Sequence, residues 1–214
     1  MPDRALTVDL AAHGSKMNAS GLNRGSPGNL SVRTKGGMLV TPSGVPFDHL
    51  EPADVVPMGL DGHYEHRLEP STEWRFHRDL YVAKPEVQAI VHAHPIYCTT
   101  LAIRGLDIPA VHYVIAAAGG NTIRCAPYAT FGTPEFSAVA VAALEGRSAC
   151  LLANHGMVAT GATLTKALWL AEAVEAVAQL YFNTLVLGGG NVIPDDEMAR
   201  VAERLKSYTL KPKD

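Results

Sequence analysis

The sequence predicts a single α/β domain that covers residues 1–214. Three observations predict it. A length of 214 residues is sufficient for one sizeable hydrophobic core. A content of 47% hydrophobic and 18% charged residues is typical of a globular chain. Strand and helix patterns interleave throughout, and we find no linker, internal repeat or low-complexity tract.

The first forty residues predict a helix, a loop and a hairpin. A short helix is expected from Met1 to about Ser20, followed by a loop rich in glycine. Residues 30–40 predict a β-hairpin, because Lys35-Gly36-Gly37 offers a glycine-bearing turn between two apolar runs. Thr41-Pro42-Ser43-Gly44 predicts a second turn.

The next segment predicts two strands and a helix. The strands are expected at Val55–Met58 and Tyr64–Arg67, around an Asp61-Gly62 turn. Ser71 or Thr72 suits the N-cap of a helix that carries Phe76 and Leu80 on one face.

The remaining chain alternates in the same way. Short apolar runs predict buried strands, and longer amphipathic stretches predict helices. We expect strands at Val87–Ala93 and Ala149–Ala153, and helices at Ser137–Leu144, Thr165–Leu187 and Pro194–Lys206.

Composition argues against several classes of partner. The formal net charge is −3 and no long stretch is basic, so we expect no nucleic-acid ligand. Three widely spaced cysteines (98, 125 and 150) form no CxxC pair, which favours a reducing compartment. Polar residues interrupt the longest apolar stretch, 164–188, and the N-terminus does not resemble a signal peptide. We therefore expect a cytoplasmic protein that does not bind membranes.

Histidines suggest a metal site. His92 and His94 are two residues apart at the end of an apolar strand, so their side chains point to the same face. His155 follows the other apolar strand and precedes Gly156, where backbone can approach closely. A lone histidine is more often a hydrogen-bonded core residue, but this set favours a metal such as Zn²⁺. All-histidine ligation without cysteine favours a catalytic site over a structural one.

Glu73 is the carboxylate that stands out. It falls in the first turn of the helix expected after Ser71 and Thr72, where hydroxyls and free N–H groups suit an oxyanion such as phosphate. A simple carboxylate favoured by the helix dipole explains it equally well. No lysine interrupts an apolar strand, which argues for metal chemistry over a Schiff base.

Several motifs together resemble the class II aldolase/adducin superfamily, with the family's spacing from about residue 5 onward. They are Gly21-Leu22-Asn23, Gly28-Asn29-Leu30-Ser31, Thr41-Pro42-Ser43-Gly44, Ser71-Thr72-Glu73, His92-Ala93-His94, His155-Gly156 and the segments 109–113, 116–121, 125–133 and 166–171.

The resemblance implies a central, mostly antiparallel sheet flanked by helices, in a homotetramer with active sites at subunit interfaces. It implies Zn²⁺ held by His92, His94 and His155, with Co²⁺ or Mn²⁺ as substitutes, and Glu73 as fourth ligand and catalytic base. The positions that would bind phosphate are Asn29, Ser43, Gly44, Ser71 and Thr72. Tyr113 of the neighbouring subunit would be the proton donor, and Phe131 and Tyr208 would line the aldehyde side.

The activity implied is metal-dependent cleavage of a small phosphorylated sugar, a ketose 1-phosphate, to dihydroxyacetone phosphate and an aldehyde. L-fuculose 1-phosphate, 5-deoxyribulose 1-phosphate and 5-methylthioribulose 1-phosphate are the candidate substrates, and an apolar wall with Phe131 and Ile96 suits the last two. The alternatives are a sugar-phosphate epimerase or dehydratase of the same superfamily, or a non-catalytic adducin-like assembly domain. Glu73 argues against the first two, and the complete histidine set argues against the third.

Overall fold

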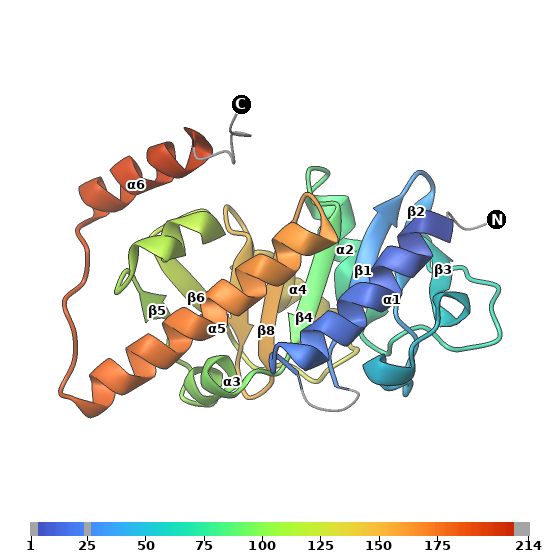
Figure 1. The fold of residues 1–214 in the computed structure, drawn as a ribbon, viewed down its shortest axis with the longest axis horizontal. Helices are drawn as coiled ribbons and strands as arrows, with labels where there is room; N and C mark the ends of the chain where they lie inside the picture. Colours follow the sequence, from blue (N-terminus) through green and yellow to red (C-terminus); the bar gives the residue numbers. More distant parts are fainter. Residues whose placement is uncertain (1–3, 24–26, 208–214) are drawn as a thin grey trace.

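One eight-stranded sheet with helices on both faces forms the core of the protein (Figure 1). The architecture comes from a computed structural model, which describes residues 4–23 and 27–207. The strands are β1 (Asn29–Thr34), β2 (Gly37–Val40), β3 (Val56–Gly59), β4 (Ala89–Ala93), β5 (Ile108–Pro109), β6 (Thr122–Ala126), β7 (Ala149–Leu152) and β8 (Gly156–Gly161). The α-helices are α1 (Arg4–Ala19), α2 (Trp74–Ala83), α3 (Ile96–Ile103), α4 (Pro134–Ala143), α5 (Leu164–Val186) and α6 (Asp195–Ser207). Three 3₁₀ helices, η1 (Phe47–His49), η2 (Pro52–Asp54) and η3 (Tyr113–Ala118), lie in the connections.

The sheet is mostly antiparallel, as the family resemblance predicts. Its strand order is β3-β2-β1-β4-β8-β7-β6-β5. Among these pairs, β6 and β7 run parallel and the others run antiparallel. The central strands β1, β4 and β8 are neighbours although they are far apart in the sequence. Their pairing therefore brings the start of β1, the end of β4 and the start of β8 side by side.

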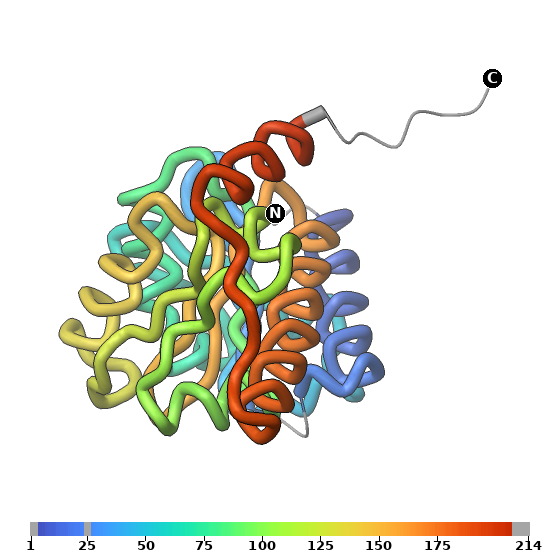
Figure 2. Tube along the Cα trace, turned by 90° about the vertical axis from the view of Figure 1, so that its left-hand side faces the viewer, coloured from blue at the N-terminus to red at the C-terminus, as the bar shows by residue number. Residues whose placement is uncertain are grey.

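Helices cover the two faces unequally. Figure 2 shows the sheet edge-on, with α1 and α5 (blue and orange) on one side and α4 (yellow) on the other. Residues of β4 alternate between two apolar clusters: Val91 packs with the α1 and α5 side, whereas Ile90 packs with Phe76 of α2 and Phe136 of α4. Because His92 has the same parity as Ile90, it faces the α2 and α4 side.

The structure confirms most of the expected elements, with shifts of a few residues at their ends. The hairpin turn lies at Lys35-Gly36, and Ser31 pairs with Val40 across β1 and β2. The expected strand at Tyr64–Arg67 is wrong, since only a single bridge joins Met58 and Tyr64. Tyr64 packs partly against the core, but Glu65 and Arg67 are charged and exposed, so the segment lacks the continuous apolar face that would stabilise a longer pairing.

The start of α2 also differs from the prediction. Glu73 is the N-cap residue, in place of Ser71 or Thr72, and the helix begins at Trp74. The Ser71 hydroxyl still accepts a hydrogen bond from the Glu73 N–H at 3.3 Å. This tight turn places the Glu73 side chain beside the sheet.

Two central elements have no clear sequence signal. Helix α3 is short and apolar on both its buried and its exposed sides, so it shows no helical period. Strand β8 is buried along nearly its whole length and therefore lacks the alternation of a half-exposed strand. None of the described helices combines the length and apolar character that crossing a lipid bilayer requires.

Candidate metal centre and active site

The predicted site residues gather around an open cavity of about 260 Å³. The start of β1, the loop before α2 and the turn between β7 and β8 border it. Its lining includes Asn29, Ser43, Gly44, Ser71 and Thr72, together with Glu73, His94, His155 and Phe131. The structure therefore brings together positions that are up to 126 residues apart, from residue 29 to residue 155.

Three imidazoles converge at the edge of this cavity. His92 lies in β4, His94 follows the strand on the same face, and His155 lies in the β7–β8 turn. The Nε2 atoms of His92 and His94 are 3.0 Å apart. The ring of His155 lies 4.9 Å from that of His92 and 4.7 Å from that of His94. One ligand atom from each residue falls within 4.8 Å of the others, so the three can bind one metal ion.

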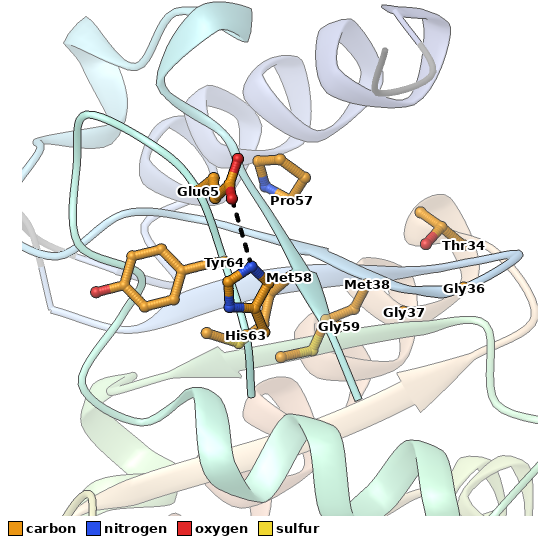
Figure 3. A pocket seen from close by; sticks show the side chains of 10 residues that line it. All are labelled: Thr34, Gly36, Gly37, Met38, Pro57, Met58, Gly59, His63, Tyr64 and Glu65. Carbon is orange, nitrogen blue, oxygen red and sulfur yellow. Dashed lines mark ion pairs between the residues drawn. The ribbon is translucent and has the colours of Figure 1, made fainter. Parts of the chain in front are cut away.

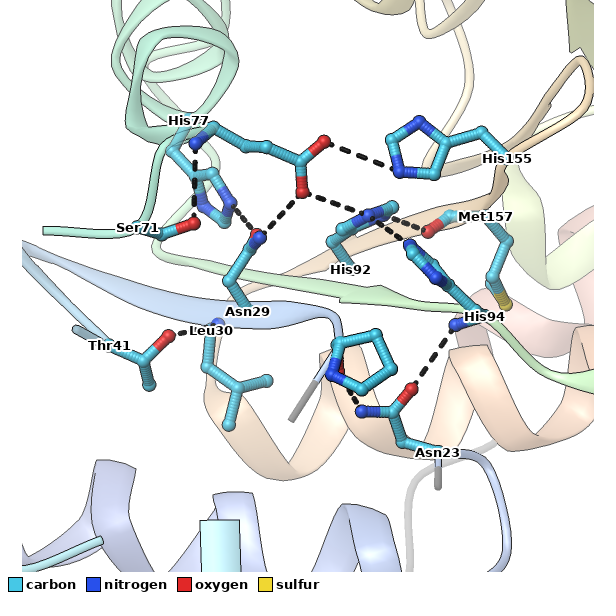
Figure 4. A network of polar contacts seen from close by, with 12 residues as sticks. Asn23, Asn29, Leu30, Thr41, Ser71, His77, His92, His94, His155 and Met157 are labelled. Atoms are coloured by element: carbon cyan, nitrogen blue, oxygen red, sulfur yellow. Dashed lines mark hydrogen bonds and ion pairs between the residues drawn. The ribbon is translucent and has the colours of Figure 1, made fainter. Parts of the chain in front are cut away.

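A backbone contact fixes which nitrogen of His92 faces the cluster. Its Nδ1 donates a hydrogen bond to the Met157 carbonyl over 2.8 Å (Figure 4). Met157 reaches that position because it pairs with Ala93 across β4 and β8. The Nε2 lone pair is therefore left for a metal, in the tautomer that such a second contact selects.

Glu73 closes the fourth side of the histidine cluster. Its side chain is buried, with only 6% of the residue exposed. Oε2 accepts a hydrogen bond from Asn29 Nδ2 at 2.8 Å and lies 3.2 Å from His92 Nε2. Oε1 lies 3.4 Å from His155 Nε2 and has no hydrogen-bond partner among the described residues. A buried carboxylate oxygen without a donor is costly, so this atom is available to a metal or a proton.

Electrostatics in the metal-free protein favour neutral imidazoles at His94 and His155, whereas His92 is drawn toward the charged form by Glu73. Burial lowers the pKa of His94 to about 3 and that of His155 to about 4, so both are neutral near pH 7. Burial alone raises the pKa of Glu73, but the charge and hydrogen bonding of His92, with His155 and Asn29, outweigh it and lower the pKa. Burial opposes charge on His92, yet the Glu73 carboxylate raises its pKa. Neutral nitrogens beside an ionised carboxylate fit a divalent metal.

A buried asparagine supports His94 from the loop side. Asn23 Oδ1 accepts a hydrogen bond from the His94 N–H at 3.4 Å, and its amide donates to the Pro27 carbonyl. Gly28, at φ +83°, packs so closely that a Cβ there would lie 2.6 Å from the His92 carbonyl oxygen. Asn23 belongs to one of the motifs that resemble the superfamily, but no local pattern in the sequence indicates that its side chain contacts Pro27 and His94.

Two loops form the predicted phosphate side. The Ser71 N–H donates to the Thr41 carbonyl at 3.0 Å, and the Ser43 N–H donates to the Glu69 carbonyl at 2.9 Å. These bonds hold loops 41–44 and 69–72 side by side. No lysine or arginine of the described chain lines the cavity, so hydroxyl and N–H groups are the donors that the described residues offer to an anion.

Of the remaining predicted residues that the structure describes, Phe131 lies at the cavity and the others do not line it. Phe131 is 60% exposed at the cavity, where Gly132 at φ +74° brings its loop against the Thr72 carbonyl. Tyr113 begins η3, is 52% exposed and is not among the residues that line the cavity. Ile96 is also outside the lining. Tyr208 lies outside the described residues.

A second cavity, of about 480 Å³, lies at the β2–β3 edge of the sheet (Figure 3). It is wide open, and His63 Nε2 lies 3.7 Å from Glu65 Oε1 there, with both side chains largely exposed. Among the described residues, the metal-ligand cluster is that of the three histidines at the other cavity. The smaller cavity is therefore the candidate active site.

Comparison with protein families agrees with this geometry. The model of the class II aldolase and adducin N-terminal domain matches residues 8–182. The matched segment contains every described site residue named above.

Individual relatives match nearly the whole chain. An L-fuculose phosphate aldolase of Escherichia coli strain K12 is 48% identical over 197 residues, which is 92% of each chain. A 5-methylthioribulose-1-phosphate/5-deoxyribulose-1-phosphate aldolase of Rhodospirillum rubrum is 48% identical over 204 residues, 95% of this chain and 92% of its own. A solved L-fuculose 1-phosphate aldolase superposes with a TM-score of 0.94 at 40% identity, covering 96% of this chain and 98% of its own.

Proposed function

The chain belongs to the class II aldolase and adducin family, and from that membership we propose that residues 1–214 act as one metal-dependent aldolase domain. The reaction is cleavage of a ketose 1-phosphate to dihydroxyacetone phosphate and an aldehyde. The observation that carries the proposal is the buried Glu73 carboxylate, which lies between the histidine cluster and the cavity with Oε1 free of hydrogen bonds.

The residues divide the work of the reaction between the two halves of the substrate. When the C3–C4 bond breaks, the C4 hydroxyl gives up its proton, C4 becomes the aldehyde carbon, and the electron pair stays on C3. Glu73 Oε1 delivers a proton to C3, and Tyr113 of the neighbouring subunit exchanges the proton of the C4 oxygen. A divalent metal, held by His92, His94 and His155 with Glu73 as fourth ligand until substrate displaces it, would act as a Lewis acid toward the negative charge that develops next to C3.

Zn²⁺ is the ion that we propose, with Co²⁺ or Mn²⁺ as replacements. Three imidazole nitrogens and a carboxylate are a typical donor set for Zn²⁺, and the absence of thiolates at the described site agrees with a catalytic ion. Elemental analysis of the purified protein, followed by reconstitution of the chelated protein with each ion, tests this choice.

The loops on one side of the cavity favour a 1-phosphate. Asn29, Ser43, Gly44, Ser71 and Thr72 line that side beside Glu73. A phosphate there is one carbon away from the ketose carbonyl, whereas a 5-phosphate would lie on the aldehyde half. We therefore expect turnover of ketose 1-phosphates and none of the matching 5-phosphates.

The aldehyde half is the variable part of the substrate. The exposed ring of Phe131 supplies an apolar wall, which gains from burying a methyl or thioether group. A single methylene changes discrimination by only about 1–3 kcal/mol, so we expect one pocket to accept several sugars. Cleavage of 5-deoxyribulose or 5-methylthioribulose 1-phosphate should at least match that of L-fuculose 1-phosphate.

A panel of these sugar phosphates, assayed for release of dihydroxyacetone phosphate, tests the proposal. A preference of about a thousandfold for L-fuculose 1-phosphate would overturn the expectation of a permissive pocket. Interconversion or dehydration of the sugar without dihydroxyacetone phosphate would indicate an epimerase or a dehydratase. Protein that neither binds a divalent metal nor acts on any member of the panel would indicate an assembly domain.

We further propose a homotetramer whose active sites lie between subunits. The exposure of Tyr113, its absence from the cavity of its own subunit, and exposed apolar side chains such as Trp169 and Leu180 support this arrangement. Co-expression of Glu73→Gln and Tyr113→Phe subunits tests it, because mixed oligomers would contain some intact sites if Tyr113 acts across the interface. Activity above that of either parent is the expected result, and no gain in verified mixed oligomers would contradict it.

A further inference from the structure

A chain of five buried or nearly buried polar groups runs from Glu73 into the interior between β1 and α2. Asn29 Nδ2 lies 2.8 Å from Glu73 Oε2, and His77 Nε2 lies 2.5 Å from Asn29 Oδ1. Ser31 Oγ lies 2.7 Å from His77 Nδ1 and 2.8 Å from the hydroxyl of Tyr81. Figure 4 shows the part of this chain that joins Asn29 and His77.

Local geometry aligns these groups. Asn29 and Ser31 are two residues apart on β1 and therefore share a face. His77 and Tyr81 are four residues apart on α2 and also share a face. His77 is in turn four positions beyond Glu73. Strand and helix thus present two polar pairs to each other across a buried seam.

The ionised carboxylate at one end sets the direction of every hydrogen bond. A carboxylate only accepts, so Asn29 must present its NH₂ group to Glu73 and its Oδ1 to His77. His77 must then donate from Nε2, and its Nδ1 accepts from the Ser31 hydroxyl. Because the Ser31 hydroxyl already donates its hydrogen bond to His77, its Oγ accepts a hydrogen bond from the Tyr81 hydroxyl. The opposite direction would place the Asn29 carbonyl oxygen against the carboxylate.

Burial agrees with a neutral ring at this position, since it lowers the pKa of His77 to about 3. A buried polar chain is costly unless all of its groups are satisfied, and apolar side chains could fill the same space. A role in orienting the Asn29 amide explains why polar side chains, and not apolar ones, fill this buried space.

We propose that His77 is a positioning residue for the proton-transfer step. By donating from Nε2 it holds the Asn29 amide with its nitrogen toward Glu73 Oε2, and this leaves Oε1 as the oxygen that exchanges the proton with substrate. The proposal rests on the function proposed above for Glu73. Without the His77 donor, the Asn29 amide can rotate and place its carbonyl oxygen against the carboxylate.

The first test reads the tautomer and does not depend on activity. ¹⁵N-histidine NMR of the Zn²⁺-loaded protein, with the His77 signals assigned by their loss in His77→Gln, should show a protonated Nε2 and an unprotonated Nδ1. A ring protonated at Nδ1, or at both nitrogens, would overturn the proposal. The tautomer is read on the wild-type protein, and His77→Phe can supply the signal assignment if His77→Gln does not fold.

The second test compares His77→Phe with His77→Gln. Phenylalanine keeps the ring shape but cannot donate, so kcat should fall by about ten- to a hundredfold, the usual effect of a misplaced catalytic group. Glutamine can donate from an amide nitrogen, and it should retain kcat within a few fold. Bound Zn²⁺ should stay stoichiometric in both. Equal losses in the two variants would indicate packing alone and overturn the proposal.

Two controls separate positioning from general destabilisation. His13 is another buried histidine, and it forms hydrogen bonds with the Asp9 carbonyl and with Thr165, away from the site. The control variant His13→Phe should therefore leave kcat unchanged. In an Asn29→Ala background, His77→Phe should cost nothing further, because it acts through Asn29. Additive losses would refute the link. Wild-type protein inert toward every ketose 1-phosphate would instead refute the proposed function, while the tautomer result would still stand.

Discussion

Gly156 lies against the imidazole of His94, and a Cβ at this glycine would lie 2.7 Å from Cδ2 of the ring. The same Cβ would lie 2.4 Å from the carbonyl oxygen of Ala93. Both distances are far below ordinary van der Waals contact. The absence of a side chain at position 156 is therefore what allows β8 to begin directly beside the histidine cluster.

Replacement of this glycine should damage the site. Gly156→Ala forces β4 and β8 apart near His94, so we expect a loss of about 1–3 kcal/mol in the free energy of unfolding, with weaker metal binding. Gly36→Ala is the matched control, because a Cβ at Gly36 would meet no atom within 4 Å. Urea unfolding and metal titration of both variants measure the effect. Equal behaviour of the two would contradict the close packing at Gly156.

Removal of a histidine ligand should abolish metal retention. In His92→Ala or His155→Ala one of three convergent imidazoles is lost, so we expect most bound metal and nearly all turnover to disappear. His63→Ala, at an exposed histidine beside the other cavity, serves as the control. Metal content by elemental analysis decides the outcome, and stoichiometric metal in either ligand variant would refute the assigned site. A chelator should inactivate the wild type, and Zn²⁺ should restore it.

Loss of the Glu73 carboxylate should impair proton transfer specifically. Glu73→Gln keeps the side-chain shape at the N-cap of α2, so the fold should persist. We expect the exchange of solvent deuterium into dihydroxyacetone phosphate to slow by about two to four orders of magnitude. The exchange is followed by NMR on the variant and the wild type at equal metal loading. An unimpaired exchange rate would exclude Glu73 as the base.

The metal-free protein should begin to lose stability as soon as the pH falls below about 6.5. The folded-state pKa values of His77, His94 and His155 lie at about 3, 3 and 4, below the ordinary 6.5. Below pH 6.5 the unfolded chain therefore binds more protons at these rings than the folded chain does, and stability falls as pH falls. A fully buried ring such as His77 contributes up to about 1.4 kcal/mol per pH unit, and the two partly open rings contribute less.

The pKa shifts of His92 and Glu73 do not cancel this loss of stability between pH 6.5 and pH 5. His92 has a raised pKa, so below pH 6.5 it is protonated in both the folded and the unfolded state. Glu73 has a lowered pKa, and the stability it contributes is lost only below about pH 4.5. Urea midpoints of the metal-free protein at pH 7 and pH 5 test the prediction, and His77→Gln should reduce the difference. A midpoint that is equal or higher at pH 5 would contradict it.

Sequence reasoning performed best where the signal is local. The helix near the N-terminus, the hairpin around Lys35-Gly36 and the long helix α5 each carry their own period or turn residue, and all three are present. It failed at α3 and β8, whose burial on more than one side removes the period. The strand expected at 64–67 failed for a different reason: exposed and half-buried residues alternate there, and beyond the single bridge at Tyr64 this alternation did not pair them with another strand.

The sequence by itself determined which residues could perform the chemistry. His-x-His at the end of a strand, His155 before a glycine and Glu73 beside two hydroxyls could be identified without a structure, because each is a short pattern with a chemical meaning. Only the tertiary structure decided how they meet. The pairing of β1, β4 and β8 brings Asn29 beside His92 and Met157 beside His92 Nδ1, and α2 packs His77 behind Asn29. Such contacts depend on sheet register and helix packing across 48 to 65 residues, and no local pattern encodes them.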